Sequence, residues 1–179
     1  QRPYERPVHF EFLPTDDRTP VNVAAGLRIA SSPYSRPRLT LTEAATASPL
    51  PDDPTEKPSF NLFFRSDYGP SSVTHPFIPE TPVRRFEELR LMAGKNDIRN
   101  PFIRDEFVRR LFTDMGHVGS VGSFNGLWIN GAYKGYFNLC ERIREPFLQN
   151  HYPGSGEWDV DYIWQFEDGD SFHFDNFLV

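Results

Sequence analysis

The chain has 179 residues, with 25 acidic and 19 basic side chains and a formal net charge of −6. This length suits one domain with a real core, and the absence of bulk basic charge argues against nucleic acid as a partner. No apolar run approaches the roughly 20 residues that a membrane span needs, so no span is predicted.

Proline and glycine are frequent, at 17 and 12 residues, and they predict many loops and short strands. Cys140 is the single cysteine, which excludes a disulfide within the chain. Because it lies in an apolar strand pattern, we expect a buried free thiol. The chain opens on Gln1 without a visible signal peptide, so we expect that something upstream was removed or is not included.

The first half of the chain predicts antiparallel strands separated by loops. Alternation of apolar and polar residues, with period two, indicates most of these strands. The expected strands are Val8–Leu13, Val21–Ile29, Arg36–Thr42, Ser59–Arg65 and Phe86–Met92. Residues 43–58 are rich in Ala, Ser, Thr, Pro and Asp, which predicts a mobile surface insertion. Tyr68–Pro82 is expected to be a proline-rich loop.

Asn100–Gly116 gives the clearest helix pattern. Asn100 suits the N-cap, Pro101 suits the first helical position, and Gly116 can end the helix with a positive φ. An apolar stripe at helical spacing predicts the side that packs against the sheet. Its members are Ile103, Phe107, Val108, Leu111, Phe112 and Met115. The remaining charges fit pairs one turn apart on a solvated face, Asp105 with Arg109 and Glu106 with Arg110.

Next comes a predicted β-hairpin, in which Phe124–Ile129 and Ala132–Leu139 flank Asn130-Gly131. Asn-Gly is the dipeptide that best tolerates the positive φ angles of a type I′ turn. This register pairs Trp128 with Tyr133 across the strands. A short helix is expected at Arg144–His151. The order of elements predicts an α+β domain, mostly antiparallel β-sheet with one main amphipathic helix.

No residue-level motif identifies a chemistry by itself. The five histidines are scattered, and we predict no metal site. The glycines of "GHVGSVGSFNG" at Gly116–Gly126 follow a helix and precede a strand, the reverse of a phosphate-binding loop. We therefore interpret this segment as a connection between the helix and the hairpin.

Several segments together resemble one family. These segments are "VNVAAGLRI", "KPSFNLFFRSDYG", "RFEELRLMAGKNDIRNPFIRDEFVRRL", "FNGLWINGAYKGYFNLCERI" and the acidic "EWDVDYIWQFEDGD". In this order, from Val8 to Asp170, they resemble the N-terminal part of the CotH kinase family, the spore-coat-protein-H-like proteins. The resemblance implies the small lobe of an atypical protein kinase. Kinases of this family transfer the γ-phosphoryl group of ATP to serine with a divalent metal. It also implies an extracytoplasmic or cell-envelope location.

The resemblance assigns expected roles to individual residues. Lys57 would contact the nucleotide phosphates, with Asp105 or Glu106 holding it in place, and the choice between the two acids stays open. Glu141 and Arg142 would lie where the hairpin leads toward the adenine. The remaining candidates match the "ND…RD" pattern. They would either lie near the phosphate groups or hold the loop against the helix. These candidates are Asn96, Asp97 and Arg104.

The resemblance leaves three functions open. Because the chain stops at Val179, the catalytic lobe is expected to be absent, and we interpret residues 1–179 as one N-terminal lobe. The first hypothesis is a non-catalytic structural or docking module that contacts other subunits or the remaining lobe. The second is the ATP-binding half of a serine kinase, with ATP and Mg²⁺ as ligands. The third is a carbohydrate-binding or adhesion β-domain.

Overall fold

The computed structural model describes residues 4–30, 57–94, 103–154, 156–162 and 165–168. Side chains from residue 161 onward are not described. The strands are β1 (Arg6–Phe12), β2 (Val21–Ala30), β3 (Ser59–Phe63), β4 (Val73–Thr74), β5 (Arg85–Phe86), β6 (Glu88–Met92), β7 (Gly122–Ile129), β8 (Ala132–Cys140), β9 (Val160–Tyr162) and β10 (Gln165–Asp168). The helices are α2 (Arg104–Asp114) and α3 (Glu145–His151).

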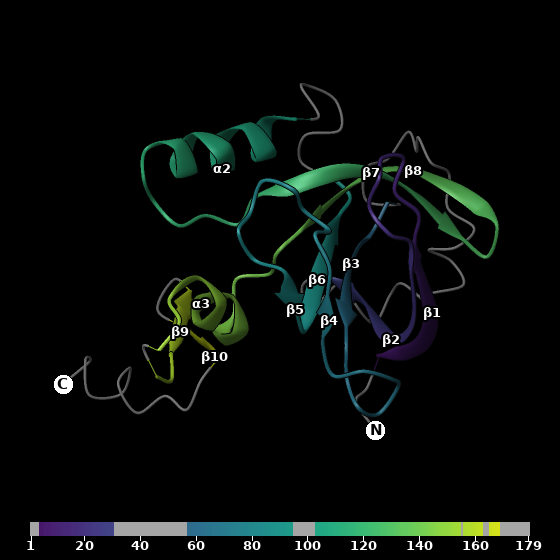
Figure 1. Ribbon diagram of the computed structural model, residues 1–179, viewed down its shortest axis with the longest axis horizontal. Coiled ribbons are helices and arrows are strands. Elements are labelled where there is room, and N and C mark those ends of the chain that lie inside the picture. Colours follow the sequence, from purple (N-terminus) through teal and green to yellow (C-terminus); the bar gives the residue numbers. More distant parts are fainter. Residues whose placement is uncertain (1–3, 31–56, 95–102, 155, 163–164, 169–179) are drawn as a thin grey trace.

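Six strands form one antiparallel sheet in the order β1-β2-β3-β6-β8-β7. The sheet is strongly curved, and the β7–β8 hairpin crosses one end of it (Figure 1). Two further pairs, β4 with β5 and β9 with β10, are small and antiparallel. The predicted mostly antiparallel fold with helices is therefore confirmed.

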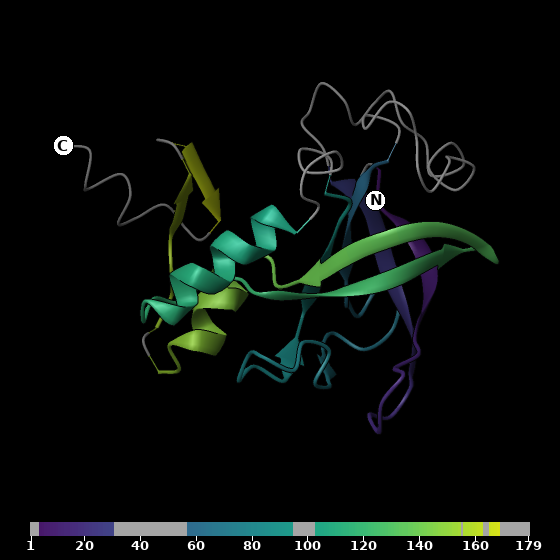
Figure 2. The same cartoon turned by 90° about the horizontal axis from the view of Figure 1, so that it is seen from above.

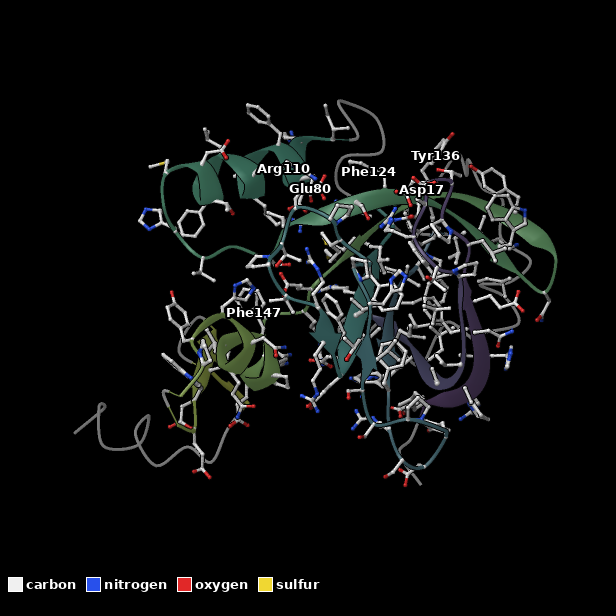
Figure 3. The ribbon with its side chains drawn as sticks, in the orientation of Figure 1. Asp17, Glu80, Arg110, Phe124, Tyr136 and Phe147 are labelled. Atoms are coloured by element: carbon white, nitrogen blue, oxygen red, sulfur yellow. The ribbon has the colours of Figure 1, made fainter. Side chains whose placement is uncertain are left out.

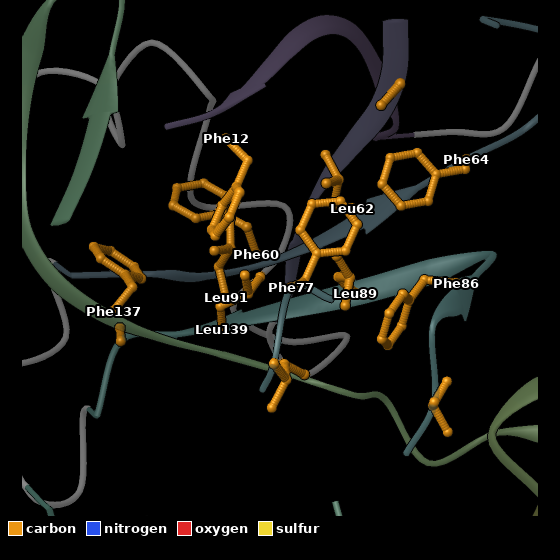
Figure 4. Packing of buried hydrophobic residues seen from close by; sticks show 14 of the residues in the cluster. Phe12, Phe60, Leu62, Phe64, Phe77, Phe86, Leu89, Leu91, Phe137 and Leu139 are labelled. Carbon is orange, nitrogen blue, oxygen red and sulfur yellow. The ribbon is translucent and has the colours of Figure 1, made fainter. Parts of the chain in front are cut away.

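The concave side of the sheet encloses an aromatic core. Phe77, from the loop between β4 and β5, is fully buried. Its ring contacts the rings of Phe10, Phe12, Phe64, His75 and Phe86, with centroids 4.6–6.4 Å apart. Leu62, Leu89 and Leu91 reach the same core from β3 and β6 (Figure 4). Burial of this apolar surface supplies most of the driving force for the curved sheet.

The hairpin has the predicted register. Asn130 and Gly131 adopt φ angles of 50° and 79°, as a type I′ turn requires. Trp128 pairs with Tyr133, and their ring centroids lie 4.7 Å apart. An irregularity between Gly126 and Trp128 shifts the register within β7. The hairpin projects beyond the rest of the sheet, and Trp128 remains 61% exposed (Figure 2).

The orientation of α2 contradicts the sequence prediction. All six residues of the predicted apolar stripe are exposed, from Phe112 at 46% to Met115 at 67%. The helix contacts the β7–β8 end of the sheet through its charged side instead, where Glu106 is 3% exposed. The periodicity correctly predicted a helix, but not which of its sides would face the sheet. Polar groups of β7 and β8 hydrogen-bond the Glu106 carboxylate there.

Other boundaries needed smaller corrections. The predicted Phe86–Met92 strand is divided into β5 and β6, and the Tyr68–Pro82 loop contains β4. The predicted helix start at Asn100 and Pro101, the strand at Arg36–Thr42 and most of the insertion at 43–58 lie outside the described residues. Gly116 has the expected positive φ, at 91°, and α3 confirms the short helix.

Candidate functional site

Lys57 lies immediately before β3 and is only 5% exposed. Its Nζ donates a hydrogen bond to the carbonyl of Tyr136, at 2.6 Å, and lies 4.5 Å from the centre of the Phe137 ring. Because burial disfavours the charged amine, the pKa of Lys57 falls from 10.5 to about 8. The side chain joins the start of β3 to β8, beyond the last β6–β8 pair, Met92 with Asn138.

Glu106 connects α2 to the hairpin. Its Oε1 accepts hydrogen bonds from the backbone N–H of Gly122, at 3.0 Å, and from Nε of Arg110, at 2.7 Å. Its Oε2 accepts one from Nδ2 of Asn138, at 2.8 Å, and pairs with Arg109 at 2.8 Å. A buried carboxylate needs such partners, because its desolvation is costly without them.

Both ion pairs predicted within the helix are present, but only one of them lies on a solvated face as predicted. Asp105 pairs with Arg109 at 3.0 Å and is half-exposed, as expected. Glu106 pairs with Arg110 at 2.7 Å but is buried, so the prediction of a solvated face was wrong for this acid. Arg110 reaches in addition to Glu80, at 3.2 Å, in the loop between β4 and β5 (Figure 3).

Lys57 and Glu106 both contact β8, but on opposite sides. Lys57 lies against Phe137, whose side chain enters the core. Glu106 hydrogen-bonds Asn138, the next residue, and successive side chains of a strand point to opposite faces. Among the described residues, the ion pairs of Glu106 are with Arg109 and Arg110. These pairs therefore do not include the expected contact between Lys57 and Glu106.

The remaining "ND…RD" candidates are only partly described. Arg104 is the first residue of α2 and is exposed. Asn96 and Asp97 lie outside the described residues. The roles expected for these three side chains stay predictions.

Glu141 follows β8 directly and is buried. Its carboxylate oxygens lie 3.1 and 3.2 Å from Nε2 of His151, the last residue of α3. The hydroxyl of Ser120 donates to the Glu141 carbonyl at 2.6 Å, and the ring of Phe147 lies 4.4 Å from that of His151. Glu141 thus holds α3 against the end of the hairpin.

Arg142 pairs with Glu88 of β6 at 2.6 Å. The two residues help to line a shallow recess between β5, β6 and α3. Its other lining residues are Phe86, Glu87, Glu141, Pro146, Phe147 and Asn150. The two candidates at the end of the hairpin, Glu141 and Arg142, therefore lie side by side in a partly apolar recess.

An arginine cluster lies on the side of the sheet opposite to the core. Phe63 is buried there, and three guanidinium groups surround its ring. Arg65, Arg28 and Arg142 lie 4.4, 4.9 and 5.7 Å from the ring centre. In a chain of net charge −6, this is a local concentration of positive charge.

Arg28, Asn61 and Arg90 form a row beside this cluster. The sheet register pairs Arg28 of β2 with Asn61 of β3, and Asn61 with Arg90 of β6. Burial, together with the nearby Arg142 and Arg144 cations, lowers the pKa of Arg90. Sequence analysis missed this row. Each residue is a polar position in an alternating strand, but only the pairing of three distant strands brings them together.

The described residues contain no group of three or more His, Cys, Asp or Glu side chains that could hold a metal ion. Cys140 is buried, as predicted, and burial raises the pKa of its thiol to about 11. Its contribution is therefore packing rather than reactivity. In the part of the chain that the structure describes, neither helix is long and apolar enough to span a membrane.

The fold defines an α+β domain in which four of the candidates contact one strand or follow its end: Lys57, Glu106, Glu141 and Arg142. The chain matches the family described as CotH kinase protein over residues 54–176, and it belongs to this family. The resemblance identified from the sequence is thereby confirmed, although β1 and β2 lie outside the matched residues. A search of curated proteins gave no match.

Proposed function

We propose that this chain forms the nucleotide-binding part of a CotH-type protein kinase. The observation that carries the proposal is that four candidate residues contact one strand, β8, or follow its last residue. Lys57 reaches β8 from the start of β3, Glu106 reaches it from α2, and Glu141 and Arg142 follow its last residue. The description of the family as kinase proteins supports the same function.

In this proposal, Lys57 supplies the cation for the phosphate groups. Phosphoryl transfer requires neutralisation of the charge on the transferring group, and a lysine is one means of doing so. Its ammonium now donates to the Tyr136 carbonyl, so phosphate oxygens would replace that acceptor. A negatively charged ligand would also favour the protonated amine, whose pKa is lowered to about 8 by burial.

Glu141 and Arg142 would border the base of the nucleotide. They line a small recess together with Phe86 and Phe147, whose rings are themselves buried, so a base would have to widen this recess. Glu106 would hold α2 on the hairpin rather than contact Lys57, since its carboxylate already accepts from Gly122, Asn138 and two arginines. Asp105 would support Arg109, and the described residues receive no role as metal ligands.

The test is a thermal-shift titration with Mg-ATP. Ligand binding to the folded state should raise the melting temperature as the nucleotide concentration increases. Lys57→Met should reduce this rise, whereas Arg85→Gln, in an exposed pair with Glu87, should leave it intact. A melting temperature that does not respond to millimolar Mg-ATP would contradict the proposal.

The exposed side of α2 favours a second function, docking to another protein. Six apolar side chains line this side, and Phe107 and Val108 are 61% and 57% exposed. A contiguous apolar surface of this kind is typical of protein interfaces. The expected partner presents an apolar groove, which another subunit or a further lobe of the same protein would supply. The extracytoplasmic location implied by the resemblance is part of both proposals.

A further inference from the structure

We propose that Arg28, Asn61 and Arg90 form a binding site for a phosphate-type oxyanion on the sheet face opposite to the core. The three residues belong to neighbouring strands and are consecutive in the pairing register. No candidate identified from the sequence lies in this row. Arg28 also lies outside the residues that match the family. The inference therefore does not depend on the nucleotide-binding function proposed above.

The first support is the incomplete hydrogen bonding of the row. Asn61 is 6% exposed, and its Oδ1 is buried without a hydrogen-bond partner in the described structure. The Nε of Arg90 is likewise buried without a partner there. Buried polar atoms are nearly always satisfied, so adjacent exceptions indicate a missing ligand or water. An asparagine amide can turn either its oxygen or its two N–H donors toward such a ligand.

The second support is the charge around the row. Arg65 and Arg142 flank Phe63 beside Arg28, and Arg144 is close enough to act on Arg90. The acids on this face already have cations: Glu5 pairs with Arg65, and Glu88 pairs with Arg142. Asp105, which acts on Arg90, and Glu106 pair with the helix arginines Arg109 and Arg110. Burial and the neighbouring cations lower the pKa of Arg90, so an anion bound there would relieve repulsion.

A phosphate group fits this arrangement better than a single carboxylate. Guanidinium groups bind phosphate through paired N–H donors, and phosphate offers enough oxygens for two arginines and an amide at once. Arg28 and Arg90 are both half-buried as whole residues, so each side chain is partly in contact with solvent although the Nε of Arg90 is buried. Inorganic phosphate and the phosphate groups of a nucleotide share this chemistry, and the experiment has to distinguish them.

The experiment is a thermal-shift titration with sodium phosphate, at an ionic strength kept constant with sodium chloride. We expect a saturable rise in melting temperature of about 3 °C or more for the unmodified chain. Arg90→Gln should abolish the rise, and Arg28→Gln should weaken it. Arg85→Gln is the matched control, because Arg85 is an exposed arginine on β5 that should not affect the response. Should Arg90→Gln fail to fold, Arg28→Gln with phosphorus NMR of bound phosphate gives the same comparison.

The proposal is overturned if phosphate gives no shift, or if the shift is the same in Arg28→Gln and Arg90→Gln as in the unmodified chain. Titrations with ADP and with adenosine distinguish inorganic phosphate from the phosphate groups of a nucleotide as the natural ligand. A stronger, Arg90-dependent response to ADP would place the row in a nucleotide site. If phosphate raises the melting temperature in an Arg90-dependent way, and neither ADP nor Mg-ATP raises it further, the oxyanion site is supported. The same result would contradict nucleotide binding.

Discussion

The two sides of the sheet are built from different kinds of interaction. The concave side is filled by aromatic and aliphatic side chains around Phe77, and it gains stability from burial alone. The opposite side carries Glu106, Arg28, Arg90 and Arg142, whose burial is favourable only with specific partners. The first side therefore mainly stabilises the fold, whereas the charged groups on the second side depend on specific partners.

The largest expected effect is the loss of Phe77. Phe77→Ala removes a fully buried ring that contacts five other rings, and it should destabilise the protein by about 4 kcal/mol. The matched control is Phe107→Ala on α2, where the ring is 61% exposed and the cost should be at most about 0.5 kcal/mol. Chemical denaturation of both variants measures the difference, and equal costs would mean that the Phe77 ring is not central to the core.

Glu106→Gln should have the next largest effect. The substitution keeps the size of the side chain but removes the charge that pairs with Arg109 and Arg110, at an expected cost of about 2–3 kcal/mol. Asp105→Asn is the control, because Asp105 is half-exposed and exposed ion pairs contribute about 0–1 kcal/mol. If the two variants lose equal stability in denaturant titrations, Glu106 is not the main connection of α2 to the hairpin.

Local patterns in the sequence predicted most of the fold. The Asn130-Gly131 turn requires positive φ, and alternation in β6 separates Leu89 and Leu91 from Arg90, so these features depend on neighbouring residues alone. The orientation of α2 could not be predicted in this way. An apolar stripe normally faces the core, but here the Asn138 amide of β8 and the Gly122 N–H of β7 hydrogen-bond Glu106.

The candidate site was predictable only where its residues belong to a family pattern. Lys57 and Glu141 were singled out from such a pattern, and both are buried next to β8 or at its end. Arg28, Asn61 and Arg90 have no local signature, since their proximity depends on the strand order β2-β3-β6. Long-range pairing of this kind is not encoded in the spacing of residues along one strand.

The pKa of Lys57 predicts how stability depends on pH. The folded-state value is about 8, below the ordinary 10.5, so the unfolded chain binds more protons between these two values. Stability should therefore rise as pH increases from about 8 toward 10.5. Lys57→Met should remove this contribution, and denaturant titrations at several pH values measure it. Cys140 acts in the opposite direction above pH 9, because burial raises the pKa of its thiol to about 11.

Because the Cys140 thiol opposes the lysine contribution, the control has to remove it. The pH series is best made in a Cys140→Ala background, where the thiol no longer offsets the lysine contribution. If stability in this background is unchanged between pH 8 and 10, or if Lys57→Met leaves the slope unaltered, Lys57 is not held in an environment that disfavours its charge.

The smallest effect on stability is expected at the exposed side of α2. Val108→Gln and Leu111→Gln replace side chains that are 57% and 48% exposed with a good helix former, so each should change stability by at most about 0.5 kcal/mol. Leu91→Gln, on the core side of β6, is the contrasting variant and should strongly destabilise the fold.

The same α2 variants test docking, because an apolar surface left exposed favours association. Light scattering of the concentrated chain should show less self-association for the double variant Val108→Gln/Leu111→Gln than for the unmodified protein. A large loss of stability in that variant would mean that this side of α2 is packed within the chain itself. In that case, the difference between a buried charged side and an exposed apolar side of the helix would not hold in solution.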